Sequence, residues 1–222
     1  MTDYLTPAAF EGAEGTRDWR VIGDGACAFF RIASLADAAR LVDAIARLSG
    51  AESHRPDIDI RPGGVTVRLV TAEAAHFGMS ERDVVLAREI STAAAALGFA
   101  SDPSAVQSVL VIPGGPAVAA LVPFWQAALG YERRPDSPEE DLVDPAGRGP
   151  AFWFEAMEEP RGDGGGAVHI AVWVPSELAE ARVAAALAAG GRLVRDDFAP
   201  AWWTLADAAG NEIDIATIQM RS

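Results

Sequence analysis

The sequence predicts an α+β protein, with helices on an antiparallel sheet in the N-terminal half and two tandem βαβββ modules after it. Three observations indicate this fold class. Before residue 98, two segments with apolar residues at helical spacing alternate with short β-branched runs. A turn-rich segment follows, and the rest of the chain repeats one order of elements. We therefore expect a first domain at 1–98, a linker at 99–105 and a second domain at 106–222.

The first domain is expected to open with a short helix and a hairpin. Thr6 and Pro7 suit the N-cap and the first position of a helix. The apolar runs at 19–22 and 26–32 flank Gly23-Asp24-Gly25, a sequence typical of a hairpin turn.

Two longer helices and a second hairpin complete the first domain. Ser34 can cap a helix that ends at Gly50, and Ser80 can cap the next one. Strands at 57–60 and 65–70 are joined through a Pro-Gly-Gly turn. Each helix has one apolar face to lay on the sheet, formed by Leu35, Ala38, Leu41, Val42, Ile45 and Leu48 in the first and by Val84, Ala87, Ile90, Ala94 and Leu97 in the second.

The second domain is predicted from an internal repeat. The strand-like runs at 107–113 and 169–175 each precede a helix, and these helices end at Gly130 and Gly190. Each helix is followed by further strand-like stretches that contain Asp-x-Ala-Gly. The two halves therefore share one βαβββ order, with the repeated tetrapeptide at 144–147 and 207–210.

Composition excludes several classes of function. The net charge is −14, so the surface repels nucleic acid and anionic membranes, and we expect neither as a partner. All 18 basic residues are Arg, which excludes Schiff-base catalysis and a P-loop lysine. The single Cys27 lies in an apolar run, where a buried strand thiol is expected. With no signal-like segment and no long apolar run, we expect a soluble, cytoplasmic protein.

The segment from Ser53 to Ala87 reads SHRPDIDIRPGGVTVRLVTAEAAHFGMSERDVVLA. It contains His54-Arg55-Pro56, a strand that ends in Thr71-Ala72, and the helix start Gly78-Met79-Ser80-Glu81-Arg82-Asp83. This order resembles the pterin-4a-carbinolamine dehydratase family, which has a His-His-Pro turn, a strand ending in Thr-His and a Gly-Leu-Ser/Thr-x-x-Asp helix start. The resemblance implies a lyase that dehydrates a 4a-hydroxytetrahydropterin.

Dehydration of a carbinolamine needs an acid for the leaving oxygen and a base for a ring proton, and imidazole suits both roles. The resemblance implies three histidines, whose positions here hold His54, Arg55 and Ala72. Since Arg and Ala cannot exchange protons at neutral pH, we expect His54 to act as acid or base and the nearby His76 to assist it. The alternatives are a His54 that only orders its loop and a His76 that faces solvent.

Substrate binding is expected at Arg55, Pro56, Asp57 and Asp83, with Trp203 as an aromatic candidate in the second domain. Arg55 offers a planar fork of donors to a pterin. Asp83 also lies in the first turn of a helix, where a carboxylate is favoured without any ligand. Trp203 belongs to a group of five tryptophans that suits either an aromatic pocket or an ordinary core.

The second half resembles the glyoxalase-like domains of the vicinal-oxygen-chelate superfamily. The resemblance rests on the residues at 124–131, 168–172 and 203–212. It implies ligands from the first and last strands of each module, which are Gln107, Glu155, His169 and Asp214 here. Such a set suits a divalent ion such as Zn, Ni, Fe or Mn.

Three functions are therefore compatible with the sequence. The first is dehydration of a 4a-hydroxytetrahydropterin in the first domain. The second is a metal-dependent lyase, isomerase or dioxygenase activity in the second domain. The third is binding of a small molecule without catalysis. In each case we expect a small-molecule ligand, of pterin type for the first domain, and the resemblance to both families implies a homodimer.

Overall fold

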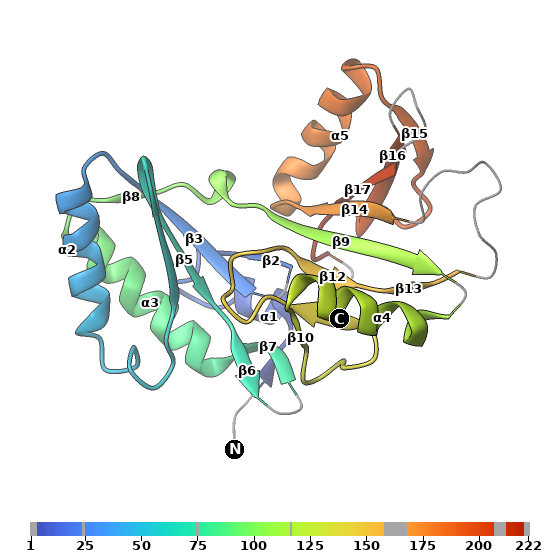
Figure 1. Ribbon diagram of the computed structural model, residues 1–222. Helices are drawn as coiled ribbons and strands as arrows, with labels where there is room; N and C mark the ends of the chain where they lie inside the picture. Colours follow the sequence, from blue (N-terminus) through green and yellow to red (C-terminus); the bar gives the residue numbers. More distant parts are fainter. Residues whose placement is uncertain are drawn as a thin grey trace. The chain divides into compact units, whose positions relative to one another are not determined.

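The computed structural model describes residues 4–23, 25–73, 76–115, 117–157, 168–206 and 212–219. The chain divides into two compact units (Figure 1). Unit 1 comprises Met1–Ala72, His76–Val106 and Ile218–Ser222, and unit 2 comprises Glu73–Ala75 and Gln107–Thr217. Both units combine helices with antiparallel sheet, so the predicted α+β class is confirmed.

Unit 1 contains a five-stranded sheet in the order β2-β3-β5-β4, with β8 paired to β3. The alternation predicted for its strands is present, because Val65, Val67 and Leu69 are buried while Thr66 and Arg68 are partly exposed. The strands are β2 (Arg20–Ile22), β3 (Gly25–Ile32), β4 (Asp57–Arg61), β5 (Gly63–Leu69) and β8 (Ala100–Ser101).

The second hairpin is tighter than the sequence suggests, because Gly63 and Gly64 belong to β5 itself. Gly63 adopts a positive φ of 108°, a conformation that glycine tolerates. At Gly64 the ring of Phe29 approaches the backbone so closely that a Cβ would lie 2.2 Å from its Cζ. The glycine pair therefore serves both the turn and the packing of β3 on β5.

Three helices accompany this sheet, α1 (Pro7–Glu11), α2 (Leu35–Ala46) and α3 (Glu81–Ala96). The predicted caps are confirmed, since Thr6 accepts a hydrogen bond from the Ala9 amide and Ser34 from the Asp37 amide. Helix α2 ends several residues before Gly50, and the chain then makes turns up to residue 53. Leu41, Ile45 and Ile90 are fully or almost fully buried, as expected for helices packed through apolar faces.

A second, three-stranded sheet of unit 1 was not anticipated by the sequence pattern. Its order is β1-β7-β6, formed by Tyr4–Leu5, His76–Ser80 and Thr71–Glu73. The segment expected to be a linker also contains structure: β8 pairs with β3, the Asp102 amide donates to the Phe29 carbonyl, and a 3-10 helix spans Pro103–Ala105. Residues up to Val106 are grouped with unit 1.

Unit 2 contains the predicted pair of βαβββ modules. Their strands form one nine-stranded sheet in the order β10-β11-β12-β9-β14-β17-β16-β15, with β13 also paired to β9. The first module comprises β9 (Ser108–Gly115), α4 (Val118–Leu129), β10 (Glu132–Arg133), β11 (Asp141–Val143), β12 (Ala151–Trp153) and β13 (Glu155–Ala156). The second comprises β14 (Val168–Trp173), a 3-10 helix (Ser176–Leu178), α5 (Ala179–Ala188), β15 (Arg192–Arg195), β16 (Trp202–Ala206) and β17 (Glu212–Ala216).

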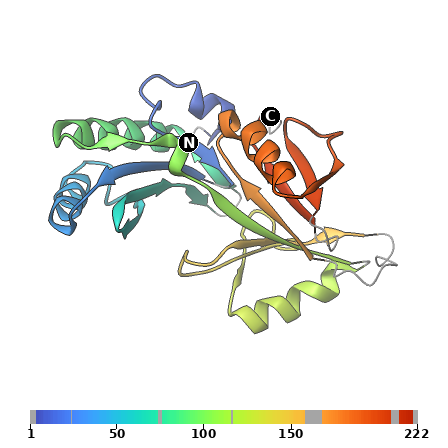
Figure 2. The same ribbon diagram turned by 90° about the horizontal axis from the view of Figure 1, so that it is seen from above.

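Each module packs its own helix on the sheet, as Figure 2 shows for α4 and α5. Val122 of α4 lies in a cluster with Leu142, Phe152 and Phe154. The cluster under α5 contains Val174, Ala179, Val183, Leu205 and Ile215, with Val172, Ala186, Trp203 and Ile213 packed against it. The tetrapeptide at 207–210 lies outside the described residues.

No helix in the described part of the chain is long and apolar enough to cross a membrane.

Candidate functional site

Helix α3 places Asp83 in its first turn. Ser80 is the N-cap, and the Ser80 amide donates a 2.8 Å hydrogen bond to Oδ2 of Asp83. This arrangement is a capping box, in which the third helical residue reaches back to the cap. The Ser80 hydroxyl also lies 2.8 Å from the same oxygen. The side chain of Asp83 is fully buried, which is unusual for a carboxylate whose role is only to cap a helix.

Strand β6 brings a second hydroxyl to this carboxylate. Thr71 Oγ1 donates to Asp83 Oδ2 at 2.7 Å and lies 2.7 Å from Ser80 Oγ. Thr71 is itself buried. Oδ2 of Asp83 is thus surrounded by hydrogen-bond donors from two separate elements.

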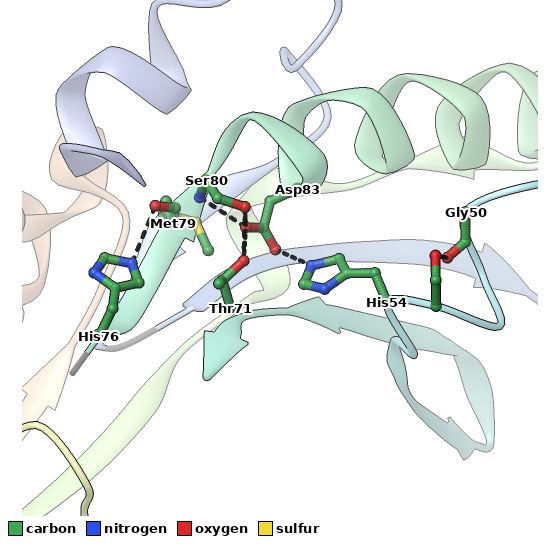
Figure 3. A network of polar contacts seen from close by, with 8 residues as sticks. Gly50, His54, Thr71, His76, Met79, Ser80 and Asp83 are labelled. Atoms are coloured by element: carbon green, nitrogen blue, oxygen red, sulfur yellow. Dashed lines mark hydrogen bonds and ion pairs between the residues drawn. The ribbon is translucent and has the colours of Figure 1, made fainter. Parts of the chain in front are cut away.

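The other carboxylate oxygen meets His54. Nε2 of His54 lies 2.6 Å from Oδ1 of Asp83, and a dashed line marks this contact in Figure 3. The imidazole is held in the loop after α2, where the His54 amide donates to the Gly50 carbonyl at 2.9 Å. Its side chain is 12% exposed, so the pair is accessible from the His54 side alone. Within the described part of the chain, Nδ1 of His54 has no hydrogen-bond partner.

The surroundings decide the charge of Asp83. Burial alone raises its pKa, because a low-dielectric site disfavours the ionised form. Hydrogen bonds from His54, Thr71 and Ser80, together with the charge of His54, outweigh burial and lower the pKa below its usual value. Asp83 is therefore a carboxylate at neutral pH and an acceptor for a proton on Nε2 of His54.

The other predicted residues of this site lie at the surface. The side chain of Arg55 is 82% exposed, and it pairs with Glu52 at 3.8 Å. Asp57 is exposed and pairs with Arg68 across β4 and β5 at 2.9 Å. Pro56 is partly exposed, and Ala72, at the position of the third family histidine, is exposed. The structure thus brings His54 and Asp83 together, whereas Arg55 and Asp57 lie at the surface in ion pairs with Glu52 and Arg68.

His76 lies in a different environment. Its ring stacks on Tyr4 with centroids 3.8 Å apart, and its Nε2 is 3.2 Å from the Met79 carbonyl. Figure 3 shows it on the far side of Thr71 and Ser80 from His54. Its contacts are those of a residue that joins β1 to β7, and its catalytic assignment stays a prediction.

Two of the four predicted metal ligands of unit 2, Gln107 and Asp214, can be placed by their contacts. Asp214 lies in β17 next to Ile215, which packs under α5, so Asp214 projects from the opposite face of the sheet. There it accepts a 2.6 Å hydrogen bond from Thr204. Gln107 is exposed, and its amide oxygen lies 3.4 Å from a guanidinium nitrogen of Arg182, on α5. The structure therefore separates Gln107 from Asp214.

Glu155 and His169 complete the predicted ligand set. Glu155 pairs with Gly114 in β13, and His169 pairs with Ile112 in β14. The side chain of His169 lies outside the described part. Among the described residues, no group of three or more His, Cys, Asp or Glu could hold a metal ion. Because the described residues do not include the His169 side chain, a metal at this sheet stays a prediction.

Sequence reasoning missed two residues of the first site. Ser80 was identified as a helix cap and Thr71 as the end of a strand, but neither was connected to His54. The Ser-x-x-Asp spacing does signal the bond between Ser80 and Asp83. The bond from Thr71 has no local signal, since it depends on how β6 lies beside the start of α3.

Comparisons with known proteins match the two halves of the chain to two different families. Residues 4–93 match the family model of pterin 4 alpha carbinolamine dehydratase, and residues 110–216 match the model of a glyoxalase-like domain. A protein of Nocardia farcinica named "Putative pterin-4-alpha-carbinolamine dehydratase" is 40% identical over 73 residues, which are 33% of this chain and 75% of the relative. A protein of the same name from Chloroflexus aurantiacus is 37% identical over 73 residues, 76% of its length.

The chain also resembles solved structures, one of which belongs to a glyoxalase superfamily member. It is the crystal structure of a glyoxalase/bleomycin resistance protein/dioxygenase superfamily member from Vibrio splendidus, with 17% identity and a TM-score of 0.32, covering 50% of this chain and 99% of its own. The family matches assign the two halves separately. Through residues 4–93 the chain belongs to the pterin 4 alpha carbinolamine dehydratase family, and it carries a glyoxalase-like domain at residues 110–216.

Proposed function

We propose that unit 1 is a lyase that dehydrates a 4a-hydroxytetrahydropterin, with His54 as its acid and base. The observation that supports this most is the contact of 2.6 Å between His54 Nε2 and Asp83 Oδ1, with Asp83 buried and His54 partly exposed. A buried carboxylate behind a partly exposed imidazole is a general arrangement for proton transfer, because the carboxylate stabilises the imidazolium form.

The reaction needs two proton transfers and one bond cleavage. Nδ1 of the protonated His54 donates its proton to the 4a-hydroxyl, and the C–O bond breaks with its electron pair leaving on water. The lone pair of the adjacent ring nitrogen forms a C=N bond to the cationic carbon. Neutral Nδ1 then takes the proton from that nitrogen, which restores the protonated imidazole. Water and a dihydropterin are the products, and the catalyst returns to its first state.

A single imidazole suffices for this cycle because of the substrate's geometry. The hydroxyl and the N–H sit on neighbouring ring atoms, so one nitrogen of His54 can reach both in turn. The second and third family positions hold Arg55 and Ala72, neither of which can exchange a proton at neutral pH. This reduced set predicts a slower enzyme than one with separate acids and bases.

Substrate binding is assigned to the surface around His54. Arg55 is exposed and its contact with Glu52 is 3.8 Å long, so its guanidinium can donate to the pterin carbonyl or ring nitrogens. Pro56 and Asp57 flank the same turn. Trp203 is partly buried under α5 in unit 2, and its part in ligand binding is a separate prediction.

The experiment is a stopped-flow measurement of the dehydration of a synthetic 4a-hydroxytetrahydropterin. We expect the wild-type chain to accelerate the reaction over buffer. His54→Ala should lose about 10²–10⁴-fold of the rate, the usual contribution of a general acid or base. His54→Asn is the matched variant, because it keeps a polar side chain beside Asp83 but cannot exchange protons. A wild-type rate equal to buffer, or an unchanged rate in both variants, would rule out the proposal.

Three further expectations accompany this proposal. Sedimentation equilibrium tests the homodimer, and fractionation of the source cells tests the cytoplasmic location. A small-molecule ligand for the glyoxalase-like domain is sought by a thermal-shift screen, because ligand binding to the folded state raises the melting temperature.

A further inference from the structure

Three oxygen atoms form a closed triangle behind His54. Thr71 Oγ1, Ser80 Oγ and Asp83 Oδ2 lie 2.7, 2.7 and 2.8 Å from one another. The Ser80 amide adds a fourth polar contact, 2.8 Å from Asp83 Oδ2. All three side chains are buried, and Figure 3 shows the carboxylate between the two hydroxyls and the imidazole.

The available protons restrict how this cluster is bonded. The two hydroxyls have one proton each, and the Ser80 amide proton points at Oδ2 in a fixed direction. A proton placed on Oδ2 would face that amide N–H, which cannot turn away because it belongs to the start of α3. The cluster therefore favours an ionised Asp83 that accepts several bonds at Oδ2.

The two carboxylate oxygens thus have separate tasks. Oδ2 accepts from Thr71 and Ser80, and this fixes the rotation of the carboxylate about its own axis. Oδ1 is left for His54, at 2.6 Å. A carboxylate in that position requires a proton on Nε2, because an unprotonated Nε2 would place a lone pair against a negative charge.

We propose that Thr71 and Ser80 are positioning residues, which hold Asp83 so that the proton of neutral His54 stays on Nε2 and Nδ1 exchanges protons with the substrate. This role in the reaction rests on the proposed dehydratase function. The tautomer of His54 and the charge of Asp83 do not depend on it. They can be measured in the free protein whether or not the protein is an enzyme.

The central variant is Thr71→Val, which has nearly the same shape and removes one donor to Oδ2. Thr71→Ser restores the hydroxyl. Thr92→Val is the matched control, because Thr92 is exposed on α3 and its hydroxyl bonds the Arg88 carbonyl of the same helix. Ser80 is not replaced, since its loss would also remove the cap of α3.

Two NMR measurements test the proposal on the full chain. The ¹⁵N shifts of the imidazoles report the tautomer, and the chain has three histidines, so His54→Asn assigns the signals. The ¹³Cγ titration of Asp83, assigned with Asp83→Asn, reports its ionisation. In the wild type we expect the tautomer with the proton on Nε2, and an Asp83 midpoint below the usual pH of about 3.9.

Thr71→Val should raise the Asp83 midpoint by about one pH unit, the size expected for one hydrogen bond to a carboxylate. It should also mix the two tautomers of His54, and it should lower kcat with little change in KM. Thr71→Ser should restore all three quantities, and Thr92→Val should leave them at wild-type values.

Several outcomes overturn the proposal. An Asp83 midpoint in the wild type at or above its usual value would do so even if Thr71→Val failed to fold. The same holds for an unchanged tautomer and midpoint in a folded Thr71→Val. If the wild type shows the expected tautomer and midpoint but no dehydratase rate, the dehydratase function fails while the hydrogen-bond arrangement stands.

Discussion

His54 Nε2 and Asp83 Oδ1 lie 2.6 Å apart, although 28 residues separate them in the chain. This contact joins the loop after α2 to the first turn of α3. Asp83 therefore serves two purposes at once, since the carboxylate that caps the helix is also the partner of the candidate acid and base. The family resemblance pointed to both residues, but only the fold shows that they form one pair.

Replacing Asp83 should cost stability as well as activity. In Asp83→Asn, one side of the amide presents N–H groups to donors, so at least one buried polar contact is lost. We expect the free energy of unfolding at pH 7 to fall by about 1–3 kcal/mol, measured by urea denaturation. Asp37→Asn is the matched control, because Asp37 occupies the same position after the N-cap of α2 but its side chain is 40% exposed. An equal loss in both variants would show that burial of Asp83 contributes nothing.

The lowered pKa of Asp83 predicts how stability depends on pH. Its pKa is lower in the folded state than in the unfolded chain, so the unfolded state binds the proton more readily. The contribution of the carboxylate is therefore complete above about pH 4 and is lost as the pH falls through the folded-state pKa. The stability difference between wild type and Asp83→Asn should shrink when urea denaturation is repeated from pH 7 down to pH 3. A constant difference would contradict the lowered pKa.

Much of the fold could be predicted because its signals are local. The caps at Ser34 and Ser80 are followed by apolar residues at helical spacing, and both helices begin where these caps predict. The βαβββ repeat was also visible, because its two helices end at Gly130 and beside Gly190 in the same sequence context. Such features depend on residues close together in the chain.

The site was harder to predict because its contacts are distant in sequence. Strands β1 and β7 are short, and the register that pairs Tyr4 with Ser80 has no pattern in either segment. The hydrogen bond from Thr71 to Asp83 depends on that same packing of β6 and β7 beside α3. Gln107 illustrates a related difficulty, since a family resemblance cannot tell which face of a sheet a residue at a strand end will occupy.

Cys27 should react slowly in the folded protein. It is buried in β3, as predicted, and burial raises its pKa to about 11, an effect that Arg68 partly offsets and Asp57 slightly increases. At pH 8 the thiolate is then about one part in a thousand, and the thiolate is the reactive form. Labelling with iodoacetamide at pH 8 should be much slower in buffer than in urea. Rapid labelling of the native protein would show that the thiol is accessible and ionised.

His76→Ala distinguishes one catalytic histidine from two. Its imidazole bonds the Met79 carbonyl and stacks on Tyr4, so we expect the variant to lose some stability and less than about tenfold of the dehydration rate. Tyr4→Leu is the companion variant, since it removes the same stack and leaves the imidazole in place. If His76→Ala loses as much rate as His54→Ala while Tyr4→Leu does not, His76 is a second acid or base. The single-nitrogen cycle at His54 would then be wrong, because the two proton transfers would be divided between two imidazoles.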